Sequence, residues 1–378
     1  MAGLTQHTTR VAIAGEPPID LPVLDGQISM SDEWIPYIQG DVTCPYTPEV
    51  DDLDPQAADI WVTLTVTRSH GRTDRIRDVS LRYAGKTLAA ITTEFAGRTI
   101  AAITRSLYHD YETPGAARHD ELRTFRLMLR EVRVDHAAAT MTLKLASGEA
   151  RLTDWDHMGP NPDREPGANL VAKINHMLAL AGFPAGLASY PSSVPTDAQI
   201  GDEALRTPGQ SALEWLQQIT RKHDLIAWCD EAGLWRLASS RNRSASRSLT
   251  SLGSDRTIVN MTEVRSRDVG WVTAVMLVYT WAGVTQYDIA YPGAPNPEKA
   301  KIVRYETPYP GPGRAARMLA QLRPRGKAVT ITAVSEPIIT PGETVIATTA
   351  TGTRTGRVAS VTWRLAADQM TITLREVA

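Results

Sequence analysis

The chain has 378 residues, 42% of them hydrophobic and 22% charged, with a formal net charge of −2. These values exclude a disordered chain, and they give no overall electrostatic attraction to nucleic acid or to acidic membranes. The length predicts two or three domains. Two cysteines, Cys44 and Cys229, are too few for a disulfide framework and are expected to be reduced and partly buried thiols.

The sequence predicts no signal peptide and no membrane-spanning helix. The first residues contain no charged start followed by an apolar run, so no signal peptide is predicted. The longest apolar runs, residues 87–91 and 271–279, are shorter than the roughly 20 residues that a membrane-spanning helix needs. We therefore expect a protein that is made in the cytoplasm and has no stable membrane anchor.

The first 155 residues show the alternation of apolar and polar side chains that half-buried strands require. Asp25-Gly26 and Asp135-His136 are suited to turns, and the polar residues 68–78 are expected to form a hairpin loop. The expected strands are residues 10–14, 25–30, 61–67, 80–84, 121–134 and 139–146. Strands at this spacing predict a small antiparallel barrel or sandwich.

The middle of the chain has helical spacing. Residues 168–181 repeat apolar side chains every three or four positions until Gly182, and a second helix is expected to start within Thr207–Ser211. Residues 225–229 and 234–237 are short apolar runs around the turn sequence 230–233. Together they predict a compact α+β module.

The rest of the chain is predicted to be β-rich again. Residues 239–254, rich in Ser and Arg, are expected to be a linker or exposed loop, and residues 291–297 and 307–313 to be Pro/Gly loops. A helix is expected at 314–322. The expected strands are residues 258–261, 274–279, 327–333, 344–348, 356–365 and 370–374. The last four predict a second small barrel.

The predicted fold is therefore a β-rich α+β protein, with two small antiparallel β-barrel units flanking an α+β module. The predicted domains are residues 1–155, an N-terminal β-barrel domain; 156–245, the α+β module; and 246–378, a C-terminal β-rich domain with a small barrel.

Two stretches place acids beside a histidine, as a metal or acid–base site would. They are His109-Asp110-Tyr111-Glu112 and Asp154-Trp155-Asp156-His157, and both occur in loop-like sequence near Pro and Gly, which favours solvated loop charges. Asp51-Asp52-Leu53-Asp54 resembles part of a calcium loop. It lacks the Gly and the distal Glu of an EF-hand, so a surface turn is expected.

Other functional motifs are weak. Gly311-Pro312-Gly313-Arg314 has the form of a helix start more than of an anion site. The basic clusters Arg241-Asn242-Arg243 with Arg247, and Arg323-Pro324-Arg325 with Lys327, lack the interleaved aromatics of a single-strand nucleic-acid platform. Trp61, Trp228, Trp235, Trp271 and Trp363 fit core or interface anchors. No catalytic, cofactor-binding or metal residue is assigned, no cofactor is expected, and no enzymatic activity is predicted.

Three stretches carry a resemblance to a known family. They are residues 208–235, which combine a small-residue cap, helix, strand, Asp-x-x-Gly turn and strand; residues 325–345, with Pro341-Gly342-Glu343 before a strand; and residues 356–376. In this order of parts the chain resembles the bacteriophage tail hub proteins: the baseplate hub proteins of contractile tails and the related minor tail proteins of long non-contractile tails.

The resemblance implies a structural virion protein at the tail tip. It implies a homotrimeric ring in which small barrels form a pseudo-sixfold collar around a channel, through which DNA passes only in transit during ejection. The implied partners are the tail tube or distal tail protein, the tape measure protein, and tip or fibre proteins. Many members of the family also carry a cell-wall hydrolase, and no recognisable one is present in this sequence.

Two alternatives remain open from the sequence. A carbohydrate- or receptor-binding β module of a phage tail would be favoured by exposed Trp and Tyr in the loops expected within residues 279–309. An enzyme such as a wall hydrolase would be favoured by a pair of acids that converge in a cleft.

Overall fold

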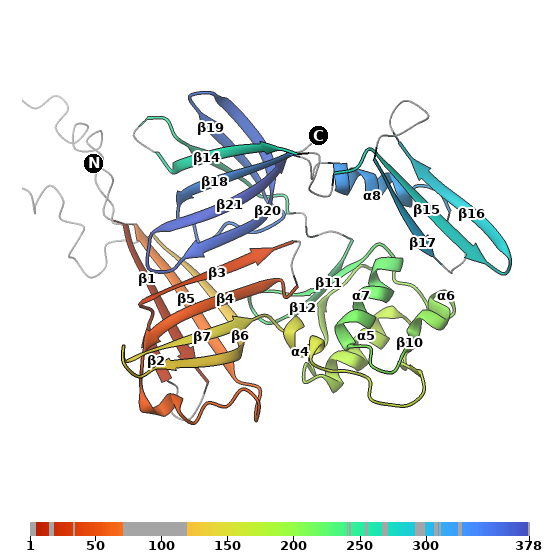
Figure 1. The fold of residues 1–378 in the computed structure, drawn as a ribbon, viewed down its shortest axis with the longest axis horizontal. Helices are drawn as coiled ribbons and strands as arrows, with labels where there is room; N and C mark the ends of the chain where they lie inside the picture. The colour runs from red at the N-terminus through yellow and green to blue at the C-terminus, as the bar shows by residue number, and fades with distance from the viewer. Residues whose placement is uncertain are drawn as a thin grey trace, which may run out of the picture.

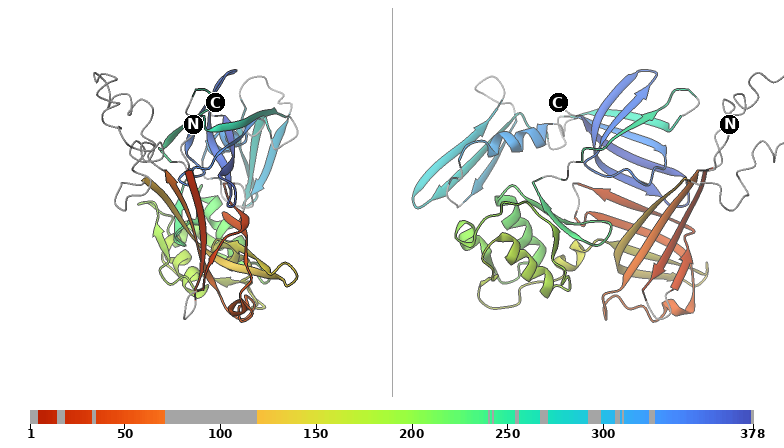
Figure 2. Two further views of the ribbon diagram at one scale, coloured as in Figure 1. Left: turned by 90° about the vertical axis from the view of Figure 1, so that its left-hand side faces the viewer. Right: turned by 180° about the vertical axis from the view of Figure 1, so that it is seen from behind.

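The computed structural model describes residues 5–14, 19–32, 35–70, 119–239, 241, 243–253, 256–266, 271–291, 299–305, 309, 311–323 and 327–376. It has four parts, named here by their residues: the N-terminal β unit (5–147), the helical module (148–238), the C-terminal β unit (243–266 with 327–376) and the projecting unit (271–323). The N-terminal β unit and the projecting unit lie at opposite ends of the long axis (Figures 1 and 2).

The N-terminal β unit follows the alternation seen in the sequence. Along β5, Val62, Leu64 and Val66 are buried, while the threonines between them are partly exposed. Its strands pair antiparallel in the order β3-β4-β7-β6-β5-β1-β2. Their bounds are β1 Thr5–Ile13, β2 Ile19–Pro22, β3 Asp25–Ser31, β4 Ile38–Pro45, β5 Trp61–His70, β6 His119–Asp135 and β7 Thr140–Ala146, with the short 3-10 helix η1 Pro48–Val50 after β4.

The C-terminal β unit joins the N-terminal one edge to edge. The long strand β20 pairs with β19 and β21, and its last five residues also pair with β3 of the N-terminal unit. The result is one 13-stranded sheet. The strand bounds are β13 Ser246–Thr250, β14 Ile258–Arg265, β18 Lys327–Val334, β19 Thr344–Thr349, β20 Gly352–Arg364 and β21 Gln369–Glu376.

The expected barrels are not closed in the described residues. The long path through the sheet ends at β14 and at β2. At the gap in the N-terminal unit, Val23 N–H donates to Thr9 O and Leu24 N–H donates to Thr43 O, which are single bonds instead of a strand ladder. A β-rich α+β fold is confirmed. The expectation of two closed barrels is wrong for the described residues, because β20 pairs with β3 of the other unit and the two units form one open sheet.

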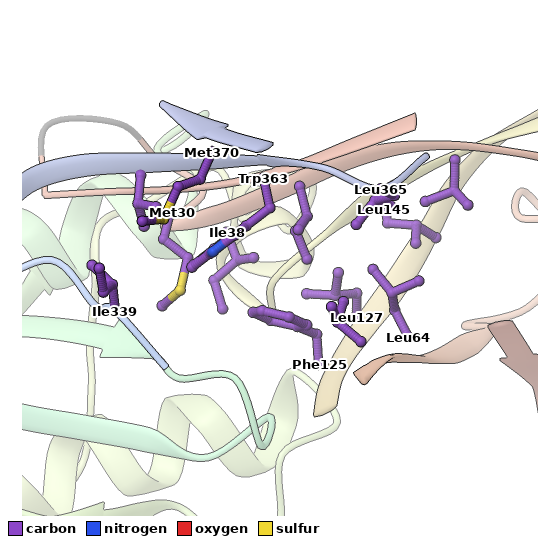
Figure 3. Close-up of a cluster of buried hydrophobic side chains, with 14 of the residues drawn as sticks. Met30, Ile38, Leu64, Phe125, Leu127, Leu145, Ile339, Trp363, Leu365 and Met370 are labelled. Atoms are coloured by element: carbon purple, nitrogen blue, oxygen red, sulfur yellow. The ribbon is translucent and has the colours of Figure 1, made fainter. Parts of the chain in front are cut away.

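The joined sheet has a continuous hydrophobic core. Figure 3 shows Met30, Ile38 and Phe125 from the N-terminal unit packed with Trp363 and Met370 from the C-terminal unit. The Phe125 and Trp363 rings have their centroids 5.9 Å apart. This shared core fixes the two β units relative to each other, while the predicted domain boundaries at residues 155 and 245 stay a prediction.

The helical module forms as the sequence predicts. Leu170, Ile174 and Leu178 on α5 pack with Trp215 on α7 and Trp235 on β12, and all five are buried. The helices are α4 Glu149–Thr153, α5 Leu170–Leu180, α6 Asp197–Ile200 and α7 Ala212–Lys222, with the 3-10 helix η3 Gly201–Ala204. The strands are β8 Asp163–Arg164, β9 Leu187–Ser189, β10 Leu205–Arg206, β11 Ile226–Cys229 and β12 Trp235–Ala238.

A capping box starts α7. The Ser211 side chain accepts from Glu214 N–H at 3.1 Å, and the Glu214 carboxylate accepts from Ser211 N–H at 3.2 Å. We expect Ser211→Ala to lower the free energy of unfolding by about 1 kcal/mol, because one backbone N–H loses its partner. Chemical denaturation followed by tryptophan fluorescence measures this, with Ser244→Ala in an exposed segment as the control. Equal unfolding midpoints for the two variants would contradict the assignment.

The projecting unit has its own sheet, and two loop predictions fail near it. Strands β16 Val284–Ala290 and β17 Ala300–Tyr305 occupy sequence expected to be loops, and both pair with β15 Ala274–Trp281, with helix α8 Arg314–Leu322 against one face. Residues 239–254 likewise contain β13, which pairs in parallel with β19. These strands are short, and β13 and β17 are edge strands in which Ser, Lys and Arg side chains interrupt the apolar alternation.

Several expected features lie outside the described residues. They include the strand at 80–84, most of the loop at 68–78, the His109–Glu112 stretch and most of the loop at 291–297. The described part of the loop at 68–78 belongs to β5, which continues to His70. In the part of the chain that the structure describes, no helix is both long and apolar enough to cross a membrane.

Candidate assembly surfaces

One arginine holds three of the four parts together. Arg123 on β6 is buried, and its Nη1 donates to Pro337 O at 2.6 Å and to Ile339 O at 2.7 Å in the C-terminal β unit. Its guanidinium lies about 5 Å from the ring centroids of Phe125 and Trp363. It also lies 3.6 Å from Glu231 of the helical module. Because Arg123 contacts three parts of the chain at once, we expect these parts to move as one body.

A second arginine closes the other side of this junction. Arg241 stacks on Tyr37 and on Trp228, with centroid distances of 4.6 and 5.4 Å, and its Nη1 lies 3.4 Å from Asp32 Oδ1. Burial raises the pKa of Asp32, and the Arg241 charge opposes this rise. Burial also raises the pKa of the Tyr37 hydroxyl. Arg241, from the basic cluster at residues 241–247, therefore has a structural role: it packs between Tyr37 of the N-terminal β unit and Trp228 of the helical module.

A buried carboxyl group lies between the N-terminal β unit and the helical module. Glu149, the first residue of α4, is almost completely buried, and its Oε1 accepts from Cys229 N–H at 2.9 Å. Oε2 has no hydrogen-bond partner among the described residues. Burial raises the pKa of Glu149, opposed by the Ser147 hydroxyl, the Cys229 amide and the Arg241 charge. Burial of this carboxyl group therefore favours its neutral form.

The projecting unit contacts the helical module through charged groups. Arg314, the first residue of α8, lies 3.3 Å from Asp224 and also donates to the carbonyls of Arg221 and Lys222 at the end of α7. Arg317 lies 2.6 Å from the same aspartate. The buried residues of the projecting unit form a cluster of their own. Its orientation therefore depends on this ionic contact and on the chain connections.

The projecting sheet has one covered face and one open face. Val275, Leu277 and Tyr279 of β15 point toward α8, and Asp288 of β16 accepts from Ala315 N–H at 2.8 Å. The strand register puts the neighbouring positions on the opposite face. There, the row Ile302–Met276–Ile289 lies next to the row Arg304–Val278–Tyr287.

The open face is unusually apolar for a solvent-facing sheet. Tyr287 is 56% exposed, Ile302 55% and Ile289 48%, although a sheet with one face in solvent normally places polar side chains on that face. Exposed apolar patches of this kind mark interaction sites in soluble proteins. The open face is defined as the side of this sheet that carries Met276, Val278, Tyr287, Ile289, Ile302 and Arg304, of which Val278 is itself buried. It is the principal candidate site.

Exposed aromatics do occur where a carbohydrate site would need them. Trp281, Tyr287 and Tyr291 are each close to half exposed. However, the register pairs Trp281 with Val284 on the α8 side of the sheet and Tyr287 with Val278 on the open side. Because Trp281 and Tyr287 point to opposite faces, they do not form a single stacking platform for a sugar.

The acid–histidine stretch at residues 154–157 makes structural contacts. Arg130 pairs with both carboxylate oxygens of Asp154, and His157 Nε2 lies 2.9 Å from Asn161 O. Asp156 forms a backbone bridge with Ser211 at the start of α7. The described residues contain no group of three or more His, Cys, Asp or Glu side chains placed to hold a metal ion.

The other motifs singled out in the sequence lie in turns, at a helix start or in the core. Asp51, Asp52 and Asp54 lie in an exposed turn after η1, and Gly313 precedes α8 with Arg314 as its first residue. Arg247 pairs with Glu343. Trp228, Trp235 and Trp363 are buried anchors as expected, Trp61 and Trp271 are partly buried, and both cysteines are buried free thiols.

The sequence interpretation missed the residues that the structure brings together. Arg123 sits in a strand pattern like any exposed charge, and Ile289 and Ile302 fall within sequence expected to be loops. The signal available was the alternation Tyr287, Ile289, Tyr291 at every second position, which is a strand pattern with one apolar face.

Comparison with solved structures places the fold. The chain is similar to the tail protein from Neisseria meningitidis MC58, with a TM-score of 0.64 at 12% identity, covering 98% of this chain and 96% of that one. It is similar to the 43 kDa tail protein of prophage MuSo2 from Shewanella oneidensis (TM-score 0.57, 12% identity, 97% and 98% covered). The prophage tail protein gp18 from Listeria monocytogenes EGD-e gives 0.52 at 8% identity, with 98% and 95% covered.

The likeness runs along essentially the whole length of each chain. No family model matches the sequence. No curated protein matches it either. The chain therefore has the fold of phage tail proteins, which confirms the resemblance at the level of structure.

Proposed function

We propose that this protein is a structural component of a phage tail tip: a baseplate hub or minor tail protein that forms a homotrimeric ring. The ring joins the tail tube to the tip and surrounds a channel through which DNA passes during ejection. Its neighbours are the tail tube or distal tail protein, the tape measure protein, and tip or fibre proteins. It acts in the virion and catalyses no reaction.

The observation that carries this proposal is the full-length fold likeness to tail proteins at TM-scores above 0.5. Two further features support it. The β units and the helical module are bound into one body by Arg123 and the shared core, as a load-transmitting ring requires. The open face also exposes apolar side chains that a neighbouring protein would cover.

The test is the mass of the purified chain by light scattering across a concentration series, with negative-stain images of the same fractions. We expect a mass three times that of the 41.3 kDa chain and a ring with an open centre. A monomer at every concentration would overturn the ring. Binding to cell-wall glycans by such a monomer would instead support the carbohydrate-binding alternative.

A further inference from the structure

The open face of the projecting sheet lacks a partner within its own chain. α8 covers the opposite face, and the nearest contact to the helical module is the ionic one at Asp224. Burying Tyr287, Ile289, Ile302 and Met276 would remove roughly 400 Å² of surface, about half of what one partner contributes to a standard interface. The remaining contact must come from the charged side chains around this face.

These surrounding charges are positive. Residues 271–323 contain six basic and three acidic residues. Among the open-face positions that the structure describes, Arg304 is the charged one. Lys301 lies on the same exposed edge strand β17, but the register pairs it with Val275 and so places it on the α8 side of the sheet. Neither Arg304 nor Lys301 forms an ion pair with a carboxylate of the described residues. The surface that covers this face should therefore be acidic.

The same chain carries such a surface at its other end. The first 70 residues contain eleven acidic residues and two basic ones. Glu49, Asp51, Asp52 and Asp54 are exposed in the turn that begins at η1, and they form no ion pair with the described cations. Figures 1 and 2 place this part of the N-terminal β unit and the projecting unit at opposite ends of the molecule, so the two surfaces meet only between copies.

We propose that the open face of one copy docks onto the acidic turn at residues 48–54 of a second copy. This inference rests on the proposed assembly of several copies and names the surfaces through which they meet. Because the two surfaces differ, the contact is head-to-tail, which closes into a ring when the rotation between copies allows it. Opposite charges on the two ends orient the copies and accelerate their encounter.

Disulfide cross-linking between two differently marked chains tests the contact. One full-length chain carries Ile302→Cys, and the other carries Glu49→Cys, Asp52→Cys or Asp54→Cys; the native cysteines are buried and stay in place. We expect a cross-linked dimer on non-reducing gels from at least one of these mixtures. The control mixture pairs Ile302→Cys with Thr351→Cys, in the exposed turn between β19 and β20, and should yield at least tenfold less dimer.

Charge reversal adds specificity to the test. Adding Arg304→Glu to the Ile302→Cys chain should reduce the dimer yield at least fivefold, and Asp52→Lys in a Glu49→Cys or Asp54→Cys partner should restore it. Yields no higher than the control in all three mixtures would overturn the docking. If light scattering still shows a trimer in that case, the ring stands and uses other surfaces; if the chain is monomeric throughout, both proposals fail.

Discussion

Replacing Arg123 with alanine is expected to lower the free energy of unfolding by about 3–5 kcal/mol, the range for breaking a buried charge network. Two carbonyl oxygens, those of Pro337 and Ile339, lose their donor, and Glu231 loses its positive neighbour. The aromatic pair Phe125 and Trp363 also loses the cation packed on it. The affected groups belong to three parts of the chain, so we expect these parts to unfold at different denaturant concentrations in the variant.

Denaturant unfolding should be followed by tryptophan fluorescence and by circular dichroism. The matched control is Arg133→Ala on the same strand, whose side chain is 73% exposed and pairs with Glu131. We expect that control to change stability by less than about 0.5 kcal/mol. For Arg123→Ala, we expect the two probes to give different midpoints. A single transition at the control's midpoint would show that Arg123 does not hold the junction.

The sequence predicts the local elements well because their signals are local. The alternation in β5, the helical spacing of α5 and the capping sequence at Ser211 each depend on neighbouring residues. The α8 helix at 314–322 is confirmed to the residue. A β-rich α+β protein with the parts in this order follows from these patterns alone.

What the sequence does not show is how distant segments meet. The pairing of β20 with β3 joins residues more than 300 positions apart, and no local pattern distinguishes two closed barrels from two barrels opened into one sheet. The role of Arg123 cannot be predicted from local sequence either, because it depends on carbonyl groups more than 200 residues away. The open face was missed for another reason: β17 is an edge strand whose Lys and Arg hide the strand pattern.

The buried Glu149 leads to an expected pH dependence that can be assigned to one residue. Its pKa in the folded protein is raised by burial above the ordinary value of 4.5, so the folded chain holds a proton that the unfolded chain releases above that pH. The unfolded state then binds fewer protons, and stability falls as pH increases. The contribution is fully present below pH 4.5 and is lost as the pH rises toward the folded-state pKa, by about 1.4 kcal/mol per pH unit.

Glu149→Gln should remove this dependence. The glutamine Oε1 can still accept from Cys229 N–H, and the amide stays neutral where the carboxyl group would ionise. Ser147, Cys229 and Arg241 interact with Glu149, and the Asp230 and Arg126 charges act on the adjacent Cys229; the variant leaves these groups unchanged. We therefore expect the variant to be more stable than the natural chain at pH 8 and similar to it at pH 5.

Unfolding free energies measured at half-unit steps from pH 5 to pH 8 give the difference between the two chains. Glu49→Gln, at an exposed position in the η1 turn, provides the control. Its free energy of unfolding should change with pH in the same way as that of the natural chain. A constant difference between Glu149→Gln and the natural chain across this range would mean that Glu149 is ionised in the folded protein. In that case the Arg241 charge would outweigh the cost of burial, and the junction would be held by an ion pair at a distance instead of by a neutral carboxyl group.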